Sequence, residues 1–391
     1  MSRIDDLEYL KKANLYRTRS LRTGSGGRYV SIDGRQLLNF SSNDYLGLSH
    51  HPEVILAAHE AAVKFGFGAT GSPLISGYTS VHQELEFALA EFLNYPRCLL
   101  FSSGYLANLG IAGALLKRHD LFIQDKLNHA SLLDSAKLCG AELQRYNHLD
   151  LKQAEQKLQK FSHKSTEDTT AKNILWATEG IFSMDGDSPD LFTASLTADI
   201  FNALLWVDDA HGIGVLGEKG RGCLEIQHLN SEQIPVLSGT FGKAFGTAGA
   251  FVVGDNTLIE TIIQKARSYQ FNTAMPTPVA AASLEALKLI QSEPWRREKI
   301  LDLIERLRQQ SERYGLSENL CISDSAIQPY ILHSETAALE TADYLKSRGI
   351  FANAIRPPTV PKNQSRLRLT LHSDLEIEDI DLLVQCLIRN Y

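Results

Sequence analysis

Short apolar runs that alternate with helical patterns are the feature that most limits how this chain can fold. The runs carry Val, Ile, Trp and Leu and are bounded by Gly or Pro, as is typical of strands. We predict strands at Arg97–Ser102, Asp120–Gln124, Asn173–Thr178, Leu204–Asp208, Pro235–Thr240 and Gly249–Gly254. Helical patterns follow the first two, at Tyr105–Lys117 and Ala130–Leu138. This alternation predicts an α/β fold with a mostly parallel sheet that is covered on both faces.

The pattern changes near Pro276, which predicts a second and smaller domain. Helical spacing appears at Val279–Gln291 and Arg296–Tyr314, and a further strand and helix set follows at Ala326–His333, Thr336–Arg348, Arg366–His372 and Ile377–Arg389. A chain of 391 residues is too long for one simple core. We therefore expect a large domain at 46–289 and a small C-terminal α/β domain at 290–391. The segment 1–45, with a helix and a hairpin around Asp33-Gly34, is expected to pack with the small domain.

Composition excludes several classes of function. The formal net charge is -7 and no long basic run occurs, which argues against nucleic acid or an anionic membrane as the main partner. The five cysteines are scattered without a Cys-x-x-Cys pair, so we expect reduced thiols and no metal site. The beginning of the chain is too acidic for a signal peptide, and no apolar stretch reaches membrane-spanning length. We expect a soluble cytoplasmic protein.

Lys243 lies in the glycine-rich stretch Ser238–Gly246, between Gly242 and Gly246 and close to the hydroxyl residues Ser238 and Thr240. About thirty residues upstream, the apolar run Leu204–Val207 leads directly into Asp208, Asp209 and His211. A lysine that must reach a carbonyl carbon needs backbone with few side chains around it. An acid and an imidazole at the end of a strand are well placed to hold an aromatic heterocycle. The combination predicts a Schiff-base site for pyridoxal phosphate.

Asp208 and Asp209 are adjacent on a predicted strand, so their side chains point to opposite faces. We expect one of them, Asp208, to keep the cofactor ring nitrogen protonated. The other is expected to be a structural hydrogen-bond acceptor.

Two further positions lie where a predicted strand meets a predicted helix. At Gly104, small residues open a helix whose unpaired N–H groups suit a phosphate, although an ordinary turn explains this stretch equally when it is taken alone. His129 has two interpretations, as a helix cap or surface histidine and as a ring that stacks on the cofactor. The order of the three motifs along the chain, rather than any one of them, favours the cofactor site.

The stretch Gly212–Gly217 matches the dinucleotide fingerprint G-x-G-x-x-G. That fingerprint requires a helix directly after it, whereas Glu218–Gly222 is helix-breaking. A nucleotide-dependent dehydrogenase is therefore the most distant alternative.

The chain resembles the α-oxoamine synthases, pyridoxal-phosphate enzymes of the aspartate-aminotransferase-like fold (fold type I). The resemblance extends over essentially the full length and rests on Asn39–Leu48, Ser102–Tyr105, Thr178–Asp187, Val207–Gly212 and Thr240–Lys243. Ser325–Pro329, Ala354–Pro361 and Arg366–Leu371 are similar to the branch that condenses L-alanine with a pimeloyl thioester in biotin biosynthesis. The resemblance implies a sheet of seven strands, decarboxylative acyl transfer and a homodimer. It also implies an acyl donor on coenzyme A or acyl carrier protein.

The resemblance also implies roles for single residues. Lys243 would bind the cofactor aldehyde, Asp208 its ring nitrogen, and His211 and Ser183 its phenolic oxygen and surroundings. His129 would stack on the ring and take part in proton transfer, while Gly104, Tyr105 and Thr240 would hold the phosphate. Arg356 would bind the amino-acid carboxylate, Asn43 would line the amino-acid pocket, and Arg17 and Thr359 match substrate-contacting positions. Two alternatives stay open, namely a sister enzyme that uses glycine, and an aminotransferase of the same fold.

Overall fold

The structure is a computed structural model that describes residues 3–165, 172–321 and 323–388. The chain divides into two units. Unit 1 comprises Met1–His50, Ser183–Asp187 and Trp295–Tyr391, and unit 2 comprises His51–Phe182 and Ser188–Pro294. The boundaries between the units lie after His50 and after Pro294, whereas the sequence placed them after residues 45 and 289. The sequence also did not predict that the short segment Ser183–Asp187 belongs to unit 1.

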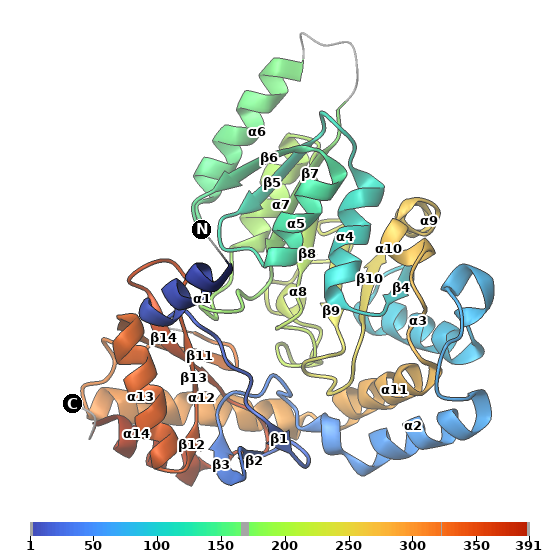
Figure 1. The fold of residues 1–391 in the computed structure, drawn as a ribbon. Helices are drawn as coiled ribbons and strands as arrows, with labels where there is room; N and C mark the ends of the chain where they lie inside the picture. Colours follow the sequence, from blue (N-terminus) through green and yellow to red (C-terminus); the bar gives the residue numbers. More distant parts are fainter. Residues whose placement is uncertain (1–2, 166–171, 322, 389–391) are drawn as a thin grey trace. The chain divides into compact units, whose positions relative to one another are not determined.

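Unit 2 is built on a seven-stranded sheet with the order β4-β10-β9-β8-β7-β5-β6 (Figure 1). The strands are β4 (Arg97–Phe101), β5 (Leu121–Asp125), β6 (Glu142–Tyr146), β7 (Ile174–Glu179), β8 (Leu204–Asp208), β9 (Val236–Thr240) and β10 (Ala250–Gly254). Only β10 runs antiparallel to its neighbours β4 and β9, and the other pairs are parallel. The predicted mostly parallel sheet is confirmed.

The helices of unit 2 complete the alternation with the strands. They are α2 (Pro52–Phe65), α3 (Ser80–Leu93), α4 (Gly104–Leu115), α5 (Ala130–Cys139), α6 (Leu151–Ser165), α7 (Leu191–Ile200), α8 (Cys223–Ile226), α9 (Asn256–Lys265), α10 (Arg267–Gln270) and α11 (Thr277–Ser292), with a π-helical turn η2 at Pro73–Gly77. Apolar residues of α4, α5 and α9 share one core cluster with the sheet, including Ile111, Leu132 and Ile259. Strands β5 and β7 are buried along their whole length, as a sheet covered on both faces requires.

Strand β6 was not predicted from the sequence. Its residues are mostly exposed or half-buried, and Glu142 and Arg145 interrupt the apolar pattern. The strand pairs only with β5 and closes one side of the sheet. Because an edge strand has one neighbour and a partly solvated surface, it does not need the continuous apolar run that identified the others.

Unit 1 contains two small sheets with the orders β1-β2-β3-β12 and β11-β14-β13. Its elements are α1 (Arg3–Lys12), β1 (Arg22–Thr23), β2 (Tyr29–Ile32), β3 (Arg35–Asn39), η1 (Leu48–His50), α12 (Trp295–Arg313), β11 (Ile327–His333), α13 (Glu335–Ser347), β12 (Ile350–Phe351), β13 (Asn353–Ile355), β14 (Ser365–Thr370) and α14 (Ile377–Ile388). Strand β12 pairs with β3, so the N-terminal segment shares a sheet with the C-terminal part of the chain. The predicted hairpin is present, with Asp33 and Gly34 both at positive φ between β2 and β3.

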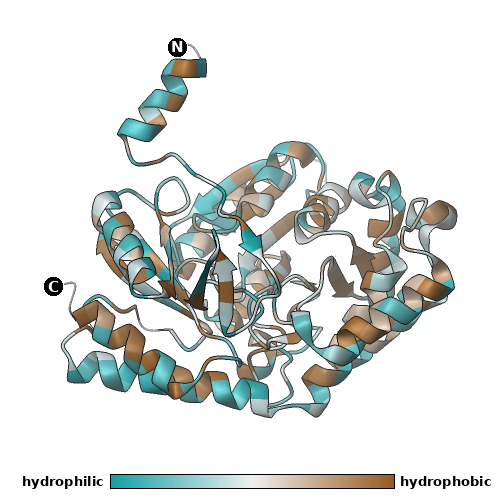
Figure 2. Cartoon of the chain, turned by 60° about the horizontal axis from the view of Figure 1, so that its bottom comes forward, coloured by the Kyte–Doolittle hydropathy of each residue, from teal (hydrophilic) through white to brown (hydrophobic). Residues whose placement is uncertain are grey.

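Helices of both units carry hydrophilic and hydrophobic residues along their length (Figure 2), which is typical of helices that cover a core on one side. Among the described residues, no helix has the length and apolar character that a membrane span demands.

Strand direction determines where the polar residues of unit 2 meet. Strands β4, β5, β7, β8 and β9 run in the same direction, so their carboxyl ends lie at one edge of the sheet. Register places Glu179 beside Asp208, and Asp208 beside Ser238. In open α/β sheets this edge is where ligands bind.

Candidate active site

Lys243 lies in a tight loop between β9 and β10. The N–H of Phe241 donates to the carbonyl of Gly249 (3.0 Å), and the N–H of Thr247 donates to the carbonyl of Phe241 (2.9 Å). Within the loop, Gly246 at φ +66° donates its N–H to the carbonyl of Lys243 (2.8 Å). These bonds fix the backbone around a half-buried lysine at the carboxyl end of β9.

The structure brings Lys243 together with the Asp-His motif. Its Nζ lies 2.9 Å from Nε2 of His211, a buried residue in the turn after β8. Asp208 is the last residue of β8, and its Oδ2 accepts a hydrogen bond from Nδ2 of Asn108 (2.7 Å). The two motifs that the sequence singled out, about thirty residues apart, therefore lie on neighbouring strands of one sheet.

Asn108 is a residue that the sequence analysis missed. Its Nδ2 also donates to Oγ of Ser131 (2.9 Å), and that hydroxyl lies 2.7 Å from Nδ1 of His129. A continuous polar chain thus runs from Asp208 through Asn108 and Ser131 to His129. Position offered a signal, because Asn108 follows Gly104 by four residues and four-residue spacing places both on one face of α4.

His129 is the N-cap of α5, where its Nδ1 accepts from the N–H of Ser131 (3.3 Å). Its own N–H donates to Oε1 of Glu179 (2.6 Å). Desolvation of the ring is the main cause that lowers the pKa of His129; the charge of Lys243 acts in the same direction and Asp208 opposes it. The capping interpretation is confirmed, while the stacking role stays a prediction.

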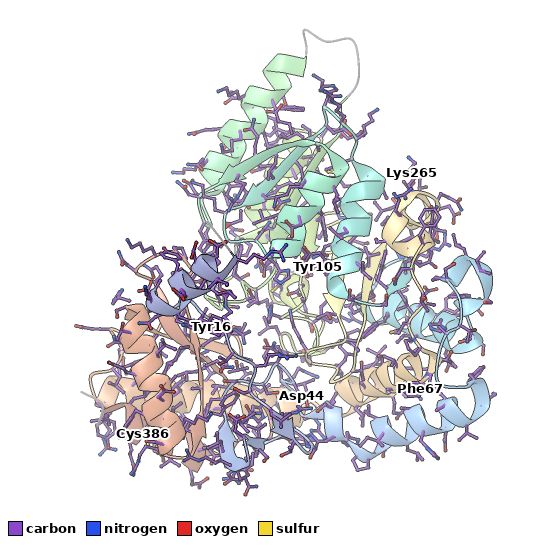
Figure 3. All side chains as sticks on the ribbon, viewed as in Figure 1. Tyr16, Asp44, Phe67, Tyr105, Lys265 and Cys386 are labelled. Carbon is purple, nitrogen blue, oxygen red and sulfur yellow. The ribbon has the colours of Figure 1, made fainter. Side chains whose placement is uncertain are left out.

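The Gly104 turn and Thr240 lie next to each other at the same sheet edge. Ser103 caps α4 by accepting from the N–H of Leu106 (3.3 Å), and a Cβ on Gly104 would lie 4.0 Å from the side chain of Thr240. The Tyr105 side chain (Figure 3) is exposed and its hydroxyl donates to Asp134. The backbone N–H groups at the start of α4 are therefore what this turn can offer to an anion.

Asp209 is fully buried, and its Oδ2 accepts from the N–H of Cys223 (2.7 Å). Asp209 is thus the structural acceptor that the sequence predicted, while the site role of Asp208 stays a prediction. Three glycines surround the carboxyl group. A Cβ on Gly180, Gly212 or Gly222 would come closer than 3.0 Å to the Asp209 side chain, a separation that real Cβ atoms do not show.

The predicted substrate residues lie in unit 1. Nη2 of Arg17 donates to Oγ1 of Thr359 (2.9 Å), so these two side chains are in contact. The guanidinium of Arg356 donates to the carbonyl of Asn14 and to that of Tyr16 (3.5 Å). Desolvation lowers the pKa of Arg356, the nearby charge of Arg17 lowers it further, and Glu335 raises it.

Asn43 and Ser183 also belong to unit 1, and the same arginine holds both. Arg368 donates from Nη1 to Oδ1 of Asn43 (2.9 Å) and from Nε to the carbonyl of Ser183 (2.6 Å). Arg368 is buried, with 8% of its surface exposed. The structure thus groups Ser183 with Asn43, whereas the resemblance grouped it with His211.

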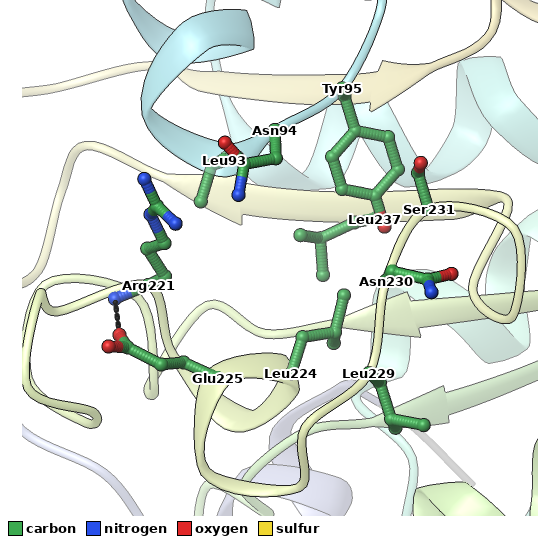
Figure 4. Close-up of a pocket in the computed structure, with 10 residues that line it drawn as sticks. All are labelled: Leu93, Asn94, Tyr95, Arg221, Leu224, Glu225, Leu229, Asn230, Ser231 and Leu237. Atoms are coloured by element: carbon green, nitrogen blue, oxygen red, sulfur yellow. Dashed lines mark hydrogen bonds between the residues drawn. The ribbon is translucent and has the colours of Figure 1, made fainter.

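A separate pocket of unit 2 contains none of the predicted site residues. It is lined by residues that include Leu93, Tyr95, Arg221, Glu225 and Leu237 (Figure 4). The N–H of Arg221 donates to Oε2 of Glu225 (2.9 Å) across one side of it.

The chain is similar to known proteins over most of its length. The family model of the class I and II aminotransferases matches residues 35–387. The 8-amino-7-oxononanoate synthase of Stutzerimonas stutzeri (strain A1501) is 47% identical, over 95% of this chain and 93% of that protein.

Two solved structures are similar over most of the chain. A serine palmitoyltransferase from S. paucimobilis, with a bound PLP–myriocin aldimine, has a TM-score of 0.91 at 27% identity and covers 99% of this chain and 96% of its own. The 8-amino-7-oxononanoate synthase of Francisella tularensis has a TM-score of 0.76 at 30% identity and covers 90% of this chain and 97% of its own.

The packing around Asp209 predicts an effect of Gly212→Ala on stability. The added methyl would overlap the Asp209 carboxyl group, and we expect the free energy of unfolding to fall by about 1–3 kcal/mol, as for other overpacked cores. In an Asp209→Ala background the overlapping atoms are gone, so the same change should cost clearly less. Denaturant unfolding of the four proteins measures both values, and equal costs in the two backgrounds would contradict the packing described here.

Proposed function

The chain belongs to the class I and II aminotransferase family, and we propose that it catalyses the decarboxylative condensation of L-alanine with a pimeloyl thioester in biotin synthesis. A bond forms between the alanine Cα and the thioester carbonyl carbon, the C–S bond breaks, and the alanine carboxylate leaves as CO₂. The products are 8-amino-7-oxononanoate, CO₂ and a free thiol. The observation that carries the proposal is the 47% identity over 95% of the chain to a synthase of this name.

The aspartate-aminotransferase-like fold is confirmed, and so is the resemblance to the α-oxoamine synthases. Fold similarity does not choose among members of this family, because the serine palmitoyltransferase has the higher TM-score of the two structures described above. Sequence identity does discriminate, since it is 47% to the S. stutzeri synthase and 27% to the palmitoyltransferase. We therefore favour alanine over serine or glycine as the amino acid.

The cofactor is pyridoxal phosphate, which when bound supplies an electron sink for negative charge at the substrate Cα. The donor set of unit 2 fits this molecule. In this proposal Lys243 would bind its aldehyde, Asp208 its ring nitrogen and His211 its phenolic oxygen, while His129 would stack on its ring. The start of α4 at Gly104 and Tyr105 would offer backbone N–H groups to the phosphate, with Thr240 beside it, whose hydroxyl donates to the carbonyl of Gly249 (2.9 Å).

Proton transfer falls to Lys243 and His129 in this proposal. Once its Nζ is free, Lys243 takes the proton from the alanine Cα. The contact of 2.9 Å with Nε2 of His211 restricts where that amine can lie. A lowered pKa leaves the His129 imidazole neutral near neutral pH, so it can first accept a proton and then return it when the substrate carbon is reprotonated after CO₂ leaves.

The substrate residues of unit 1 have chemistry that suits an amino acid and an acyl donor. Arg356 binds the alanine carboxylate, because a guanidinium can hold a carboxylate with two hydrogen bonds. Asn43 lines the amino-acid pocket. Arg17 binds the acyl donor on coenzyme A or acyl carrier protein, and Thr359, which accepts a hydrogen bond from Arg17, is a further substrate-contacting residue. Ser183 stays assigned to the surroundings of the phenolic oxygen.

We further propose that the enzyme is a homodimer and works in the cytoplasm. Exposed apolar side chains on and near α2 support self-association. Ile55, Leu56, Val63 and Phe67 are each more than half exposed, and Ile75 of the π-helical turn is 84% exposed. Exposed apolar residues of this kind are typical of a surface that another chain covers.

The proposed reaction is tested with purified enzyme, pyridoxal phosphate, pimeloyl-CoA and a panel of carboxyl-labelled alanine, serine and glycine. We expect labelled CO₂ and free thiol in equal amounts, and only with alanine at an appreciable rate. Pimeloyl-acyl carrier protein in the same assay identifies the preferred donor. A clear preference for glycine or serine would overturn the substrate assignment, and amino-group transfer to a 2-oxo acid without CO₂ release would indicate an aminotransferase.

Lys243→Ala should remove the yellow absorbance that the lysine–cofactor link gives at about 420 nm, because the loop between β9 and β10 contains no other lysine. The variant should also fail to incorporate tritium from borohydride. Lys265→Ala, which removes an exposed lysine at the end of α9, is the matched control and should retain both signals. A cofactor adduct in Lys243→Ala that borohydride can reduce would refute the assignment.

Arg356→Ala should mainly weaken the binding of alanine. We expect a loss of roughly 1.5–3 kcal/mol, the value of a hydrogen bond to a charged group, seen as a rise in the KM for alanine with little change in that for the thioester. Arg348→Ala removes an exposed arginine of the same unit and serves as the control. An unchanged KM for alanine in Arg356→Ala would contradict the role.

A further inference from the structure

Asp209 has no part in the proposed chemistry, yet it is buried next to residues that do. We infer that Asp209 is a positioning residue for His211, because its carboxyl group fixes the turn that holds the imidazole beside Lys243. The inference rests on the proposed function, which assigns His211 and Lys243 to the cofactor.

Three separate chain segments close around the Asp209 carboxyl group. Gly180 follows β7, Gly212 lies in the turn after β8, and Gly222 precedes α8. Gly222 has φ +86° and so has a second reason to be glycine, but Gly180 and Gly212 are not at positive φ. For those two, the atoms nearest to an added Cβ all belong to Asp209. Their lack of a side chain is explained by this carboxyl group alone.

Hydrogen bonds of Asp209 also fix the turn that carries His211. The carbonyl of Asp209 accepts from the N–H groups of Gly212 (3.2 Å) and Ile213 (3.1 Å), and its N–H donates to the carbonyl of Ser238 in β9 (2.9 Å). With the side-chain bond to Cys223, both ends of the segment 209–223 are attached at one point. His211 lies two residues from that point, and its Nε2 is 2.9 Å from Nζ of Lys243.

The carboxyl group acts through its shape and its hydrogen bond to Cys223. Among the described residues, its Oδ1 is buried without a hydrogen-bond partner. Burial raises the pKa of Asp209 to about 7, opposed by the hydrogen bond from the N–H of Cys223, so its surroundings disfavour the charged form. Asparagine has nearly the same shape and can still accept from Cys223, so it should substitute well.

A double-mutant cycle tests the coupling, with the dissociation constant of pyridoxal phosphate from the full-length apoprotein as the readout. We expect Asp209→Ala and His211→Ala each to weaken binding by about tenfold. The double variant should bind no more than about threefold more weakly than His211→Ala, because residues that act as a unit are not additive. Asp209→Asn should stay within about threefold of the unchanged protein.

Asp255→Ala is the matched control, since Asp255 caps α9 in the same unit by accepting from the N–H of Leu258 (2.6 Å). It should lower the thermal midpoint without coupling to His211→Ala. Full additivity of Asp209→Ala with His211→Ala would overturn the inference and leave Asp209 a stabilising residue only. If Asp209→Ala does not fold, Gly212→Ala takes the place of Asp209→Ala in the cycle, because its added methyl would meet the Asp209 carboxyl group and displace the same turn.

A second measurement needs no cofactor and separates this inference from the proposed function. The imidazole resonances of His211, identified by their loss in His211→Ala, should shift in apoprotein carrying Asp209→Ala and stay in place with Asp255→Ala. Unshifted resonances would refute the positioning role. Shifted resonances in a protein that binds pyridoxal phosphate but releases no CO₂ from alanine would overturn the proposed function and leave the positioning role intact.

Discussion

The alternation of side chains at the end of β8 is the constraint on which the arrangement of unit 2 depends. Asp209 directly follows the last residue of β8 and its N–H still donates to Ser238 of β9, so the alternation of strand side chains extends to it and gives Asp208 and Asp209 different surroundings. Asp208 stays half-buried and accepts from Asn108, whereas Asp209 is enclosed by backbone. One strand end thus supplies both a polar group for the candidate site and the attachment that holds the following turn.

Sequence periodicity was sufficient for the strands and helices that build this edge, because buried parallel strands need continuous apolar runs. Short motifs, rather than periodicity, singled out Lys243, Asp208 and His211, which the structure brings together at the ends of the neighbouring strands β8 and β9. The sequence patterns could not predict contacts between residues that are far apart in the chain. Asn108 joins Asp208 to Ser131 only because α4 and α5 pack on the same sheet, and no local pattern specifies that packing. Edge strand β6 was not predicted because its partly exposed residues do not form a continuous apolar run.

The glycines of Gly212–Gly217 show why a short motif requires its structural context. Gly212 lacks a side chain because Asp209 occupies that space, and Gly217, at φ +87°, packs against the carboxylate of Glu225. Gly214 is also at positive φ, and its N–H donates to the carbonyl of Gly220 (2.7 Å). The glycines therefore accommodate two carboxyl groups and a folded loop. A dinucleotide site would instead need a helix at Glu218, and the nearest helix, α8, begins at Cys223.

Two buried arginines explain why Ser183–Asp187 belongs to unit 1 although its flanking residues belong to unit 2. Arg366 pairs with Asp185 (2.5 Å), and Arg368 holds the carbonyl of Ser183. Buried ion pairs add little net stability, because the cost of desolvation offsets the attraction, but removing one partner is costly. Their effect is therefore to specify one position for this segment. Because Arg368 also binds Asn43, the candidate cofactor residue Ser183 and the candidate amino-acid residue Asn43 share a single support. Neither can shift within unit 1 without disturbing the hydrogen bonds of the other, a coupling between the two roles that their separation in the sequence conceals.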